Sequence, residues 1–207
     1  MSDLDIRHRA PRNELPERLK NLWWEYRLGI STRGLIDVHN TDSCPYGTSN
    51  YSGLWKLLRY LALQPSDTFV DIGCGKGRML CCAGRYSCRY VIGVDLSADL
   101  CAQARANARR MRGRRTPIVV QEGYAEKFDY AEGNVFYMFN PFGAATLDIV
   151  LEKIQHDVSD RAIRLVYANP NAAQEAVLTK HSWLERYEFW DQAEKGNQHS
   201  VAFYRSR

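Results

Sequence analysis

The chain has 207 residues, of which 45% are hydrophobic, and a formal net charge of +4. This length fits one α/β domain with a modest extension, and the composition is ordinary for a chain that packs an apolar core. No apolar run approaches the roughly 20 residues of a membrane span, and Met1–Arg12 lacks the apolar stretch of a secretory signal, so we expect a cytoplasmic protein without a membrane partner.

Six cysteines are spread along the chain, and none is paired as C-x-x-C. Because zinc sites usually show such paired spacing, we predict no metal and interpret the cysteines as reduced and mostly buried. Six arginines lie between positions 105 and 115. They could meet phosphate or an acidic protein, or they could be the solvated end of a helix whose dipole they complement. No aromatic residues interleave them, so nucleic acid is not the favoured partner.

The first predicted element is an amphipathic helix over residues 13–30. Asn13 is its expected cap, Pro16 falls in its first turn, and Gly29 is expected to end it. Leucine and aromatic residues recur at helical spacing and give it one apolar face. The helix therefore either packs on the rest of the domain or forms a lid over a binding cleft.

A long polar, turn-rich segment follows, from Ser31 to Tyr51. Loops of this length inside a compact protein are often functional. Leucines at helical spacing between positions 54 and 61 then predict a second amphipathic helix, which stops before Gln64-Pro65. This helix would deliver the chain to the first strand and place the end of the loop near a ligand there.

The segment Phe69–Leu80 is the centre of the sequence. A β-branched and aromatic run meets three glycines on alternate positions, Gly73, Gly75 and Gly77. Glycine lets the backbone turn sharply and lets a ligand approach closely. We predict a strand, a tight turn and a helix from Lys76 to about residue 86, whose opening N–H groups could bind a polar ligand.

The next strand, Tyr90–Val94, ends in Asp95, a position from which a carboxylate can bind both hydroxyls of a ribose. The glycine spacing is not the nicotinamide fingerprint G-x-G-x-x-G, because Gly77 comes one residue early and Arg78 stands at the third glycine position. The spacing D-x-G-x-G-x-G, which begins at Asp71, resembles motif I of class I S-adenosylmethionine (SAM) methyltransferases. The resemblance implies that the turn holds the amino-acid end of SAM.

Two further elements precede the fourth strand. Ser97 caps a helix that runs to about residue 111, and residues 117–121 are expected to form a short buried strand. Class I methyltransferases often carry G-D-A next, with the acidic residue on the adenine. Here Tyr124 replaces the aspartate, so the resemblance implies an adenine contact from backbone, from a neighbouring glutamate, or from Tyr124 by stacking beside Ala125.

A continuous apolar strand, residues 134–139, leads into Asn140-Pro141-Phe142. Continuous apolar strands are covered on both faces, and open α/β sheets bind ligands at the carboxyl ends of their strands. The tripeptide resembles motif IV of methyltransferases that modify nitrogen, [DNS]-P-P-[YFW], with one proline missing. This implies that the Asn140 oxygen and a proline carbonyl accept amine hydrogens. Oxygen and carbon acceptors stay open, as does a plain turn after a strand.

The C-terminal part predicts a strand at 162–168, a helix at 172–180, and a hairpin of strands 183–190 and 200–204 around a Gly-Asn turn. A closing hairpin resembles the methyltransferase sheet order 3-2-1-4-5-7-6, with strand 7 antiparallel. We therefore predict a Rossmann-like, seven-stranded α/β fold. Residues 1–50 would form an N-terminal helical cap with a substrate and cofactor loop, and residues 51–207 the SAM-binding domain.

The loop Tyr46–Tyr51 weakly resembles non-SET histone-lysine methyltransferases, although Thr48 directly follows Gly47 here. That resemblance keeps a protein substrate open. Candidates for a general base, if the N-terminal segment folds over the cleft, are Glu25, His39, Asp42, Tyr46 and Tyr51.

The sequence thus predicts a SAM-dependent methyltransferase acting on a nucleophilic atom, nitrogen favoured, of a small molecule. The alternatives are a protein-lysine or other protein side-chain methyltransferase, a non-catalytic SAM- or nucleic-acid-binding module, and an NAD-dependent oxidoreductase. The expected cofactor-binding residues are Thr48, Asp71, Gly73, Gly75, Lys76, Asp95, Leu96, Tyr124, Ala125 and Asn140. The expected catalytic residues are Asn140, Pro141, Phe142, Tyr51 and Tyr46. Oligomeric state and the role of the arginine cluster stay open.

Overall fold

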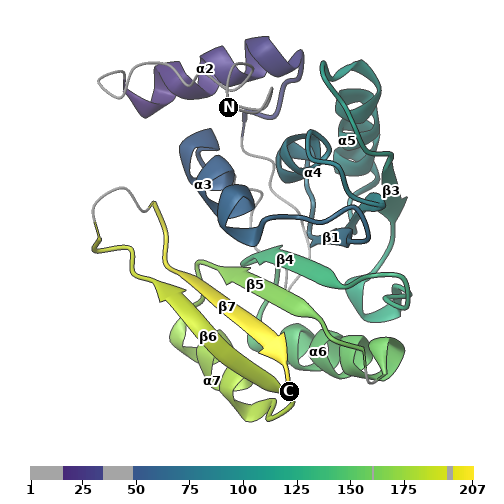
Figure 1. Ribbon diagram of the computed structural model, residues 1–207, viewed down its shortest axis with the longest axis vertical. Helices are drawn as coiled ribbons and strands as arrows, with labels where there is room; N and C mark the ends of the chain where they lie inside the picture. The colour runs from purple at the N-terminus through teal and green to yellow at the C-terminus, as the bar shows by residue number, and fades with distance from the viewer. Residues whose placement is uncertain (1–15, 35–48, 160, 195–197) are drawn as a thin grey trace.

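The computed structural model describes residues 16–34, 49–159, 161–194 and 198–207, which build one seven-stranded sheet with helices on both faces (Figure 1). The strands are β1 (Thr68–Ile72), β2 (Tyr90–Asp95), β3 (Ile118–Glu122), β4 (Val135–Phe139), β5 (Arg164–Ala168), β6 (Leu184–Trp190) and β7 (Val201–Ser206). Their order is β3-β2-β1-β4-β5-β7-β6. All neighbouring strands are parallel except β7, which is antiparallel to both β5 and β6. The predicted order and the antiparallel seventh strand are confirmed.

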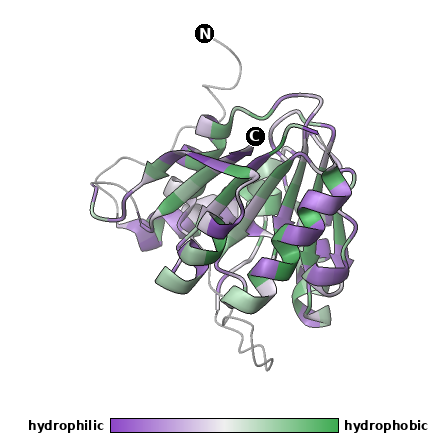
Figure 2. Cartoon of the chain, turned by 90° about the horizontal axis from the view of Figure 1, so that it is seen from below, coloured by the Kyte–Doolittle hydropathy of each residue, from purple (hydrophilic) through white to green (hydrophobic). Residues whose placement is uncertain are grey.

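The helices are α2 (Glu17–Leu28), α3 (Tyr51–Leu61), α4 (Arg78–Ala83), α5 (Ala98–Arg110), α6 (Ala144–Val158) and α7 (Ala172–Lys180), with a short 3-10 turn η1 (Ala125–Lys127). One buried cluster joins α2, α3, α4 and α5 to one face of the sheet. A second cluster joins α6 and α7 to the other face. Figure 2 shows green and purple on the same helices, as expected where one side of a helix is buried and the other meets water.

The alternation of side chains along each strand separates the two layers. In β1, Phe69 and Asp71 face the α3–α4–α5 layer, whereas Val70 and Ile72 face the α6–α7 layer. All five residues of β1 are buried, as expected for a central strand of a parallel sheet. The carboxyl ends of β1, β2 and β4 therefore meet at one edge of a fixed scaffold.

Two expectations about element boundaries and one about burial were wrong in detail. Helix α2 begins at Glu17, with Pro16 in the capping position rather than in the first turn. Helix α4 spans only Arg78–Ala83, because the glycine turn runs on through Gly77 and delays the first helical residue. Strand β3 is not buried, since it is the last strand of its edge and several of its side chains meet water.

The arginines between positions 105 and 115, in and directly after α5, are largely engaged within the protein. Arg105 and Arg114 donate to backbone carbonyls of Val120 and Ala108. Arg112 donates to the carbonyl of Tyr26 and lies over its ring, and its own backbone N–H bonds to the carbonyl of Leu28. The cluster thus binds the end of α5 to α2 and β3.

The described cysteines are all free, and those at 74, 81, 82 and 101 are buried. Within the described ranges, no group of three or more possible ligand side chains could hold a metal ion. None of the helices placed by the structure has the length and apolarity that crossing a bilayer requires.

Candidate active site

The turn after β1 has three glycines in the left-handed region. Their φ angles are 78° at Gly73, 54° at Gly75 and 76° at Gly77. A side chain at Gly73 would place its Cβ 2.5 Å from the Cβ of Pro141, and one at Gly77 would crowd Ala104 in α5. The glycines are thus needed both for the backbone conformation and for close packing.

The amides of this turn are mostly engaged inside the protein. The N–H groups of Gly73 and Cys74 both donate to the carbonyl of Val94, and that of Gly77 donates to the carbonyl of Cys74. The N–H of Gly75 donates to Oδ2 of Asp95 at 2.8 Å. A pyrophosphate needs free N–H donors, so this turn is poorly suited to a dinucleotide. It offers a ligand the bare glycine surface at Gly73, which is exposed.

Asp95 is fixed at the end of β2 by two backbone donors. Besides the bond from Gly75, its Oδ1 accepts from the N–H of Ser97 at 2.9 Å. Each carboxylate oxygen keeps a further lone pair, which suits the two hydroxyls of a ribose. Burial raises the pKa of Asp95, and the two backbone bonds work against that rise.

Asp71 lies one strand away and is more deeply buried. Burial, with a further contribution from the charge of Asp95, raises the pKa of Asp71 well above its ordinary value. Two carboxyl groups that share a low-dielectric edge are stabilised in their charged forms by a nearby cation. A sulfonium nucleoside with an amino-acid tail carries such positive charge, so the acidic groups and the occupied amides both fit SAM.

Asn140 and Pro141 close the site on the β4 side. Asn140 has φ of 42°, an uncommon left-handed conformation for a residue other than glycine. This bend brings Pro141 against Gly73, so the turn after β4 and the turn after β1 touch. The proposed acceptor side and the proposed cofactor side are therefore in direct contact.

The amide of Asn140 has a defined orientation. Oε1 of Gln174 accepts the backbone N–H of Asn171 at 2.9 Å, which identifies the other end of that amide as Nε2. Nε2 donates to Oδ1 of Asn140 at 2.5 Å and to the carbonyl of Phe142 at 2.7 Å. Because Gln174 is 1% exposed, the oxygen of Asn140 is fixed by a buried chain of bonds that starts at a backbone donor.

The adenine side is assembled next to Asp95. The N–H of Gly123 donates to the carbonyl of Asp95, which places the following residues Tyr124 and Ala125 beside the end of β2. Tyr124 is 49% exposed, and the ammonium of Lys127 lies over its ring. Leu96 is half-buried in the loop after β2. These three predicted adenine neighbours are brought together.

Other predicted residues lie differently. Lys76 is buried and donates to the carbonyl of Arg33, so it ties the glycine turn to the segment after α2. Phe142 is packed into the core on the α6 side, and Tyr51 is fully buried at the start of α3. Tyr46 and Thr48 lie outside the described residues, as do two suggested bases, His39 and Asp42.

Glu25, another suggested base, belongs to a buried ion pair that the sequence did not reveal. Its Oε1 lies 3.3 Å from the guanidinium of Arg78 and accepts both the N–H and the hydroxyl of Thr32 at 2.8 Å. Arg33 donates to its other oxygen. Arg78 also donates to Thr32 and to the carbonyl of Ser49 and lies over the ring of Tyr51. Glu25 thus joins α2 to the first residue of α4.

Sequence reasoning also missed Gln174. A usable signal was present, since Asn171 and Gln174 have the spacing of a capping box, which the structure forms at the start of α7. The contact of that helix with Asn140 could not be inferred, because it joins segments 34 residues apart in the chain.

Comparison with known proteins agrees with this geometry. Residues 69–168, from β1 to the end of β5, match the family model described as "Methyltransferase domain". A curated relative, the H3 lysine-79 specific histone-lysine N-methyltransferase of Caenorhabditis elegans, is 36% identical over 53 residues. The match spans 25% of this chain and only 6% of that protein.

Two solved structures illustrate the fold. An RNA methyltransferase from Salinibacter ruber, in complex with S-adenosylhomocysteine, has a TM-score of 0.62 at 17% identity, over 77% of this chain and 94% of that one. Magnesium protoporphyrin IX methyltransferase from Synechocystis, with bound SAM, has a TM-score of 0.56 at 13% identity, over 78% and 86% of the two chains. At these identities the likeness concerns the fold. Taken with the match of residues 69–168 to a methyltransferase domain and with the acidic, glycine-lined edge, the fold supports a class I SAM-dependent methyltransferase and is consistent with SAM as the cofactor.

Proposed function

We propose that the protein transfers the methyl group of SAM to a nitrogen atom of a small molecule. The observation that carries the proposal is the contact of the Asn140-Pro141 turn with Gly73. It puts Asn140, whose oxygen Gln174 holds in place, next to the turn that is proposed to hold the methionine end of SAM. Alignment of a nucleophile with the methyl carbon is the main task of such an enzyme.

The roles of the individual residues are part of this proposal. Asp71, Gly73 and Gly75 would surround the methionine end, and Asp95 the ribose. Leu96, Tyr124 and Ala125 would flank the adenine. The oxygen of Asn140 would accept a hydrogen of the acceptor amine and turn the nitrogen lone pair toward the methyl group.

The reaction is a displacement at carbon. The bond from nitrogen to the methyl carbon forms as the bond from sulfur breaks, and S-adenosylhomocysteine leaves as a neutral sulfide. The acceptor nitrogen loses a proton to solvent or to a base before or during attack. Neither Glu25, which is held by two arginines, nor the buried Tyr51 is well placed to accept that proton.

The test uses SAM with a radiolabelled methyl group, the purified protein, and cell extract split into small-molecule and protein fractions. We expect label in the small-molecule fraction and a product that survives base hydrolysis, because N-methyl groups survive it and methyl esters do not. Asn140→Ala should lower incorporation roughly 100-fold, the scale of one lost positioning or proton-handling group, with little change in affinity for S-adenosylhomocysteine. Base-labile label would contradict a nitrogen acceptor.

A second candidate is methylation of a protein side chain, favoured by the local similarity to a histone-lysine methyltransferase. It predicts label in the protein fraction and ε-N-methyllysine after complete hydrolysis. Label confined to that fraction would replace the small-molecule proposal by this one.

A further inference from the structure

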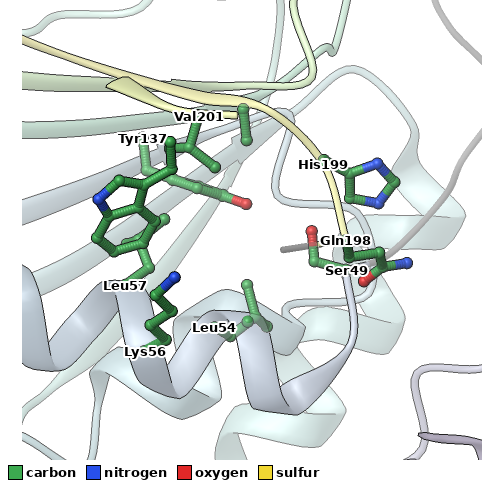
Figure 3. A pocket seen from close by; sticks show the side chains of 11 residues that line it. Ser49, Leu54, Lys56, Leu57, Tyr137, Gln198, His199 and Val201 are labelled. Atoms are coloured by element: carbon green, nitrogen blue, oxygen red, sulfur yellow. The ribbon is translucent and has the colours of Figure 1, made fainter. Parts of the chain in front are cut away.

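A pocket lies on the α3 side of the sheet, between that helix and the strands β4, β5 and β7 (Figure 3). Its cavity volume is about 30 Å³, and the pocket is partly open to solvent. Among the described residues, those that line it include Leu54, Lys56, Leu57, Tyr137, Trp190 and His199.

The two ends of the pocket differ in character. Figure 3 shows Lys56 and Leu57 at one end and Ser49, Gln198 and His199 at the other, with the hydroxyl of Tyr137 pointing into the space between them. The polar end contacts the last residue of β4, the strand that leads into Asn140. The ring of His199 packs edge-on against Phe139, 5.0 Å between centroids, and Phe139 directly precedes Asn140.

The other end combines an apolar wall with a positive charge. The ammonium of Lys56 lies 4.5 Å from the centre of the Trp190 ring, in a cation–π contact. Burial raises the pKa of Tyr137 and lowers the pKa of His199, so both side chains are neutral near pH 7. Lys56 is therefore the charged side chain among the described lining residues.

We propose that this pocket receives the body of the methyl acceptor, a small molecule with a flat apolar body and an anionic group. The anionic group would lie near Lys56, the body between Leu54 and Val201, and the nucleophile at the polar end toward Asn140. The inference rests on the proposed function for the identity of the ligand as acceptor, whereas the binding of an aromatic anion can be measured without any turnover.

The test compares indole-3-carboxylate with its neutral isostere indole-3-carboxamide, titrated into protein saturated with S-adenosylhomocysteine and followed by calorimetry. We expect the carboxylate to bind at least about fivefold more tightly, the scale of one partly exposed ion pair. Lys56→Met should remove that difference by weakening the carboxylate alone, and Lys56→Arg should keep it. Equal binding of the two probes to the wild type would overturn the charge assignment.

A second variant tests the position of the site. Gly53 lies in α3 and lines the pocket, and a Cβ built there meets nothing within 4 Å. Gly53→Leu should therefore fold well and fill part of the pocket, which would weaken carboxylate binding about tenfold or more. Gly53→Ala is the matched control and should leave binding nearly unchanged.

Affinity for S-adenosylhomocysteine separates the two proposals. It should be the same in wild type, Lys56→Met and Gly53→Leu. A loss of this affinity in Gly53→Leu would overturn the inference, because the pocket would then belong to the cofactor. A wild type that binds the carboxylate but shows no methyl transfer would instead remove the proposed function and keep the pocket as a ligand site.

Discussion

The two sides of the proposed active site are built in different ways. The cofactor side is local: Asp71 to Gly77 form one turn, and Asp95 ends the adjacent strand. The acceptor side is assembled from α3, β4, β5 and the β6–β7 hairpin, whose residues lie up to about 150 positions apart. A site built from one turn can be recognised in the sequence. A site built from distant segments cannot, because its geometry depends on how those segments pack.

The ion pair of Arg78 and Glu25 joins α2 to the start of α4, directly after the glycine turn, and its loss should have the largest effect on stability. Arg78→Met would leave the carboxylate of Glu25, 4% exposed, with the largely solvent-exposed Arg33 as its remaining charged partner among the described residues. Removing one member of a buried pair costs about 3–5 kcal/mol. Urea unfolding of the two proteins measures the difference.

The control is the double variant Glu25→Gln, Arg78→Met, which removes the buried charge as well. It should be more stable than Arg78→Met alone. If the single variant were as stable as wild type, the pair would not anchor α2 to the glycine turn.

A methyl group added at Gly73, on the cofactor side, and one added at Gly53, on the acceptor side, should change stability in opposite directions. Gly73→Ala meets Pro141 and must adopt a positive φ, so we expect a loss of at least about 2 kcal/mol and weaker binding of S-adenosylhomocysteine. Gly53→Ala, in an open helical position, should gain about 0.5–1 kcal/mol. Thermal unfolding of both variants checks the signs, and a stabilising Gly73→Ala would refute the close contact of the two turns.

Gln174 tests the orientation of Asn140. In Gln174→Glu one carboxylate oxygen can keep the N–H of Asn171, but the other would face two acceptors, the Asn140 oxygen and the Phe142 carbonyl. The Asn140 amide should turn over, and methyl incorporation from extract should fall about tenfold, the scale of one hydrogen bond. Binding of S-adenosylhomocysteine should change little.

Gln174→Met is its matched control, since it keeps the length and removes both hydrogen-bonding groups. It should lower incorporation less than Gln174→Glu. The opposite ranking would contradict the assigned amide orientation.

The smallest expected effect concerns His199. Burial lowers the pKa of His199 below its ordinary 6.5. Between pH 6.5 and that lowered value the unfolded chain binds more protons than the folded one. Stability from this residue is therefore full above pH 6.5 and falls as the pH drops through that window.

The ring is partly exposed, so solvent screens the effect and the change is small. Thermal unfolding between pH 7.5 and 5 should show a shallower decline for His199→Gln than for wild type. Identical profiles would indicate that His199 is solvated in the folded protein.

The sequence predicted the strands because each is a short apolar run bounded by turn residues, and it predicted the glycine turn because the glycine spacing is specific. The strand order followed from the resemblance to class I methyltransferases. It could not predict the ion pair of Arg78 with Glu25, because an arginine at the start of a helix carries no sequence signal for a partner 53 residues away. For the same reason, the sequence did not single out His199 and Trp190. These residues reach α3 because β7 pairs antiparallel with β6 at this end of the sheet.

The binding of SAM at the carboxyl edge of β1 and β2 is the central claim, and calorimetry with Asp95 variants tests it most directly. Asp95→Ala should weaken S-adenosylhomocysteine binding about 10- to 100-fold, the scale of hydrogen bonds to a charged group. Asp95→Asn, which keeps one acceptor, should have a smaller effect, and Asp99→Ala on the exposed start of α5 none. Equal affinity of Asp95→Ala and wild type would contradict the account.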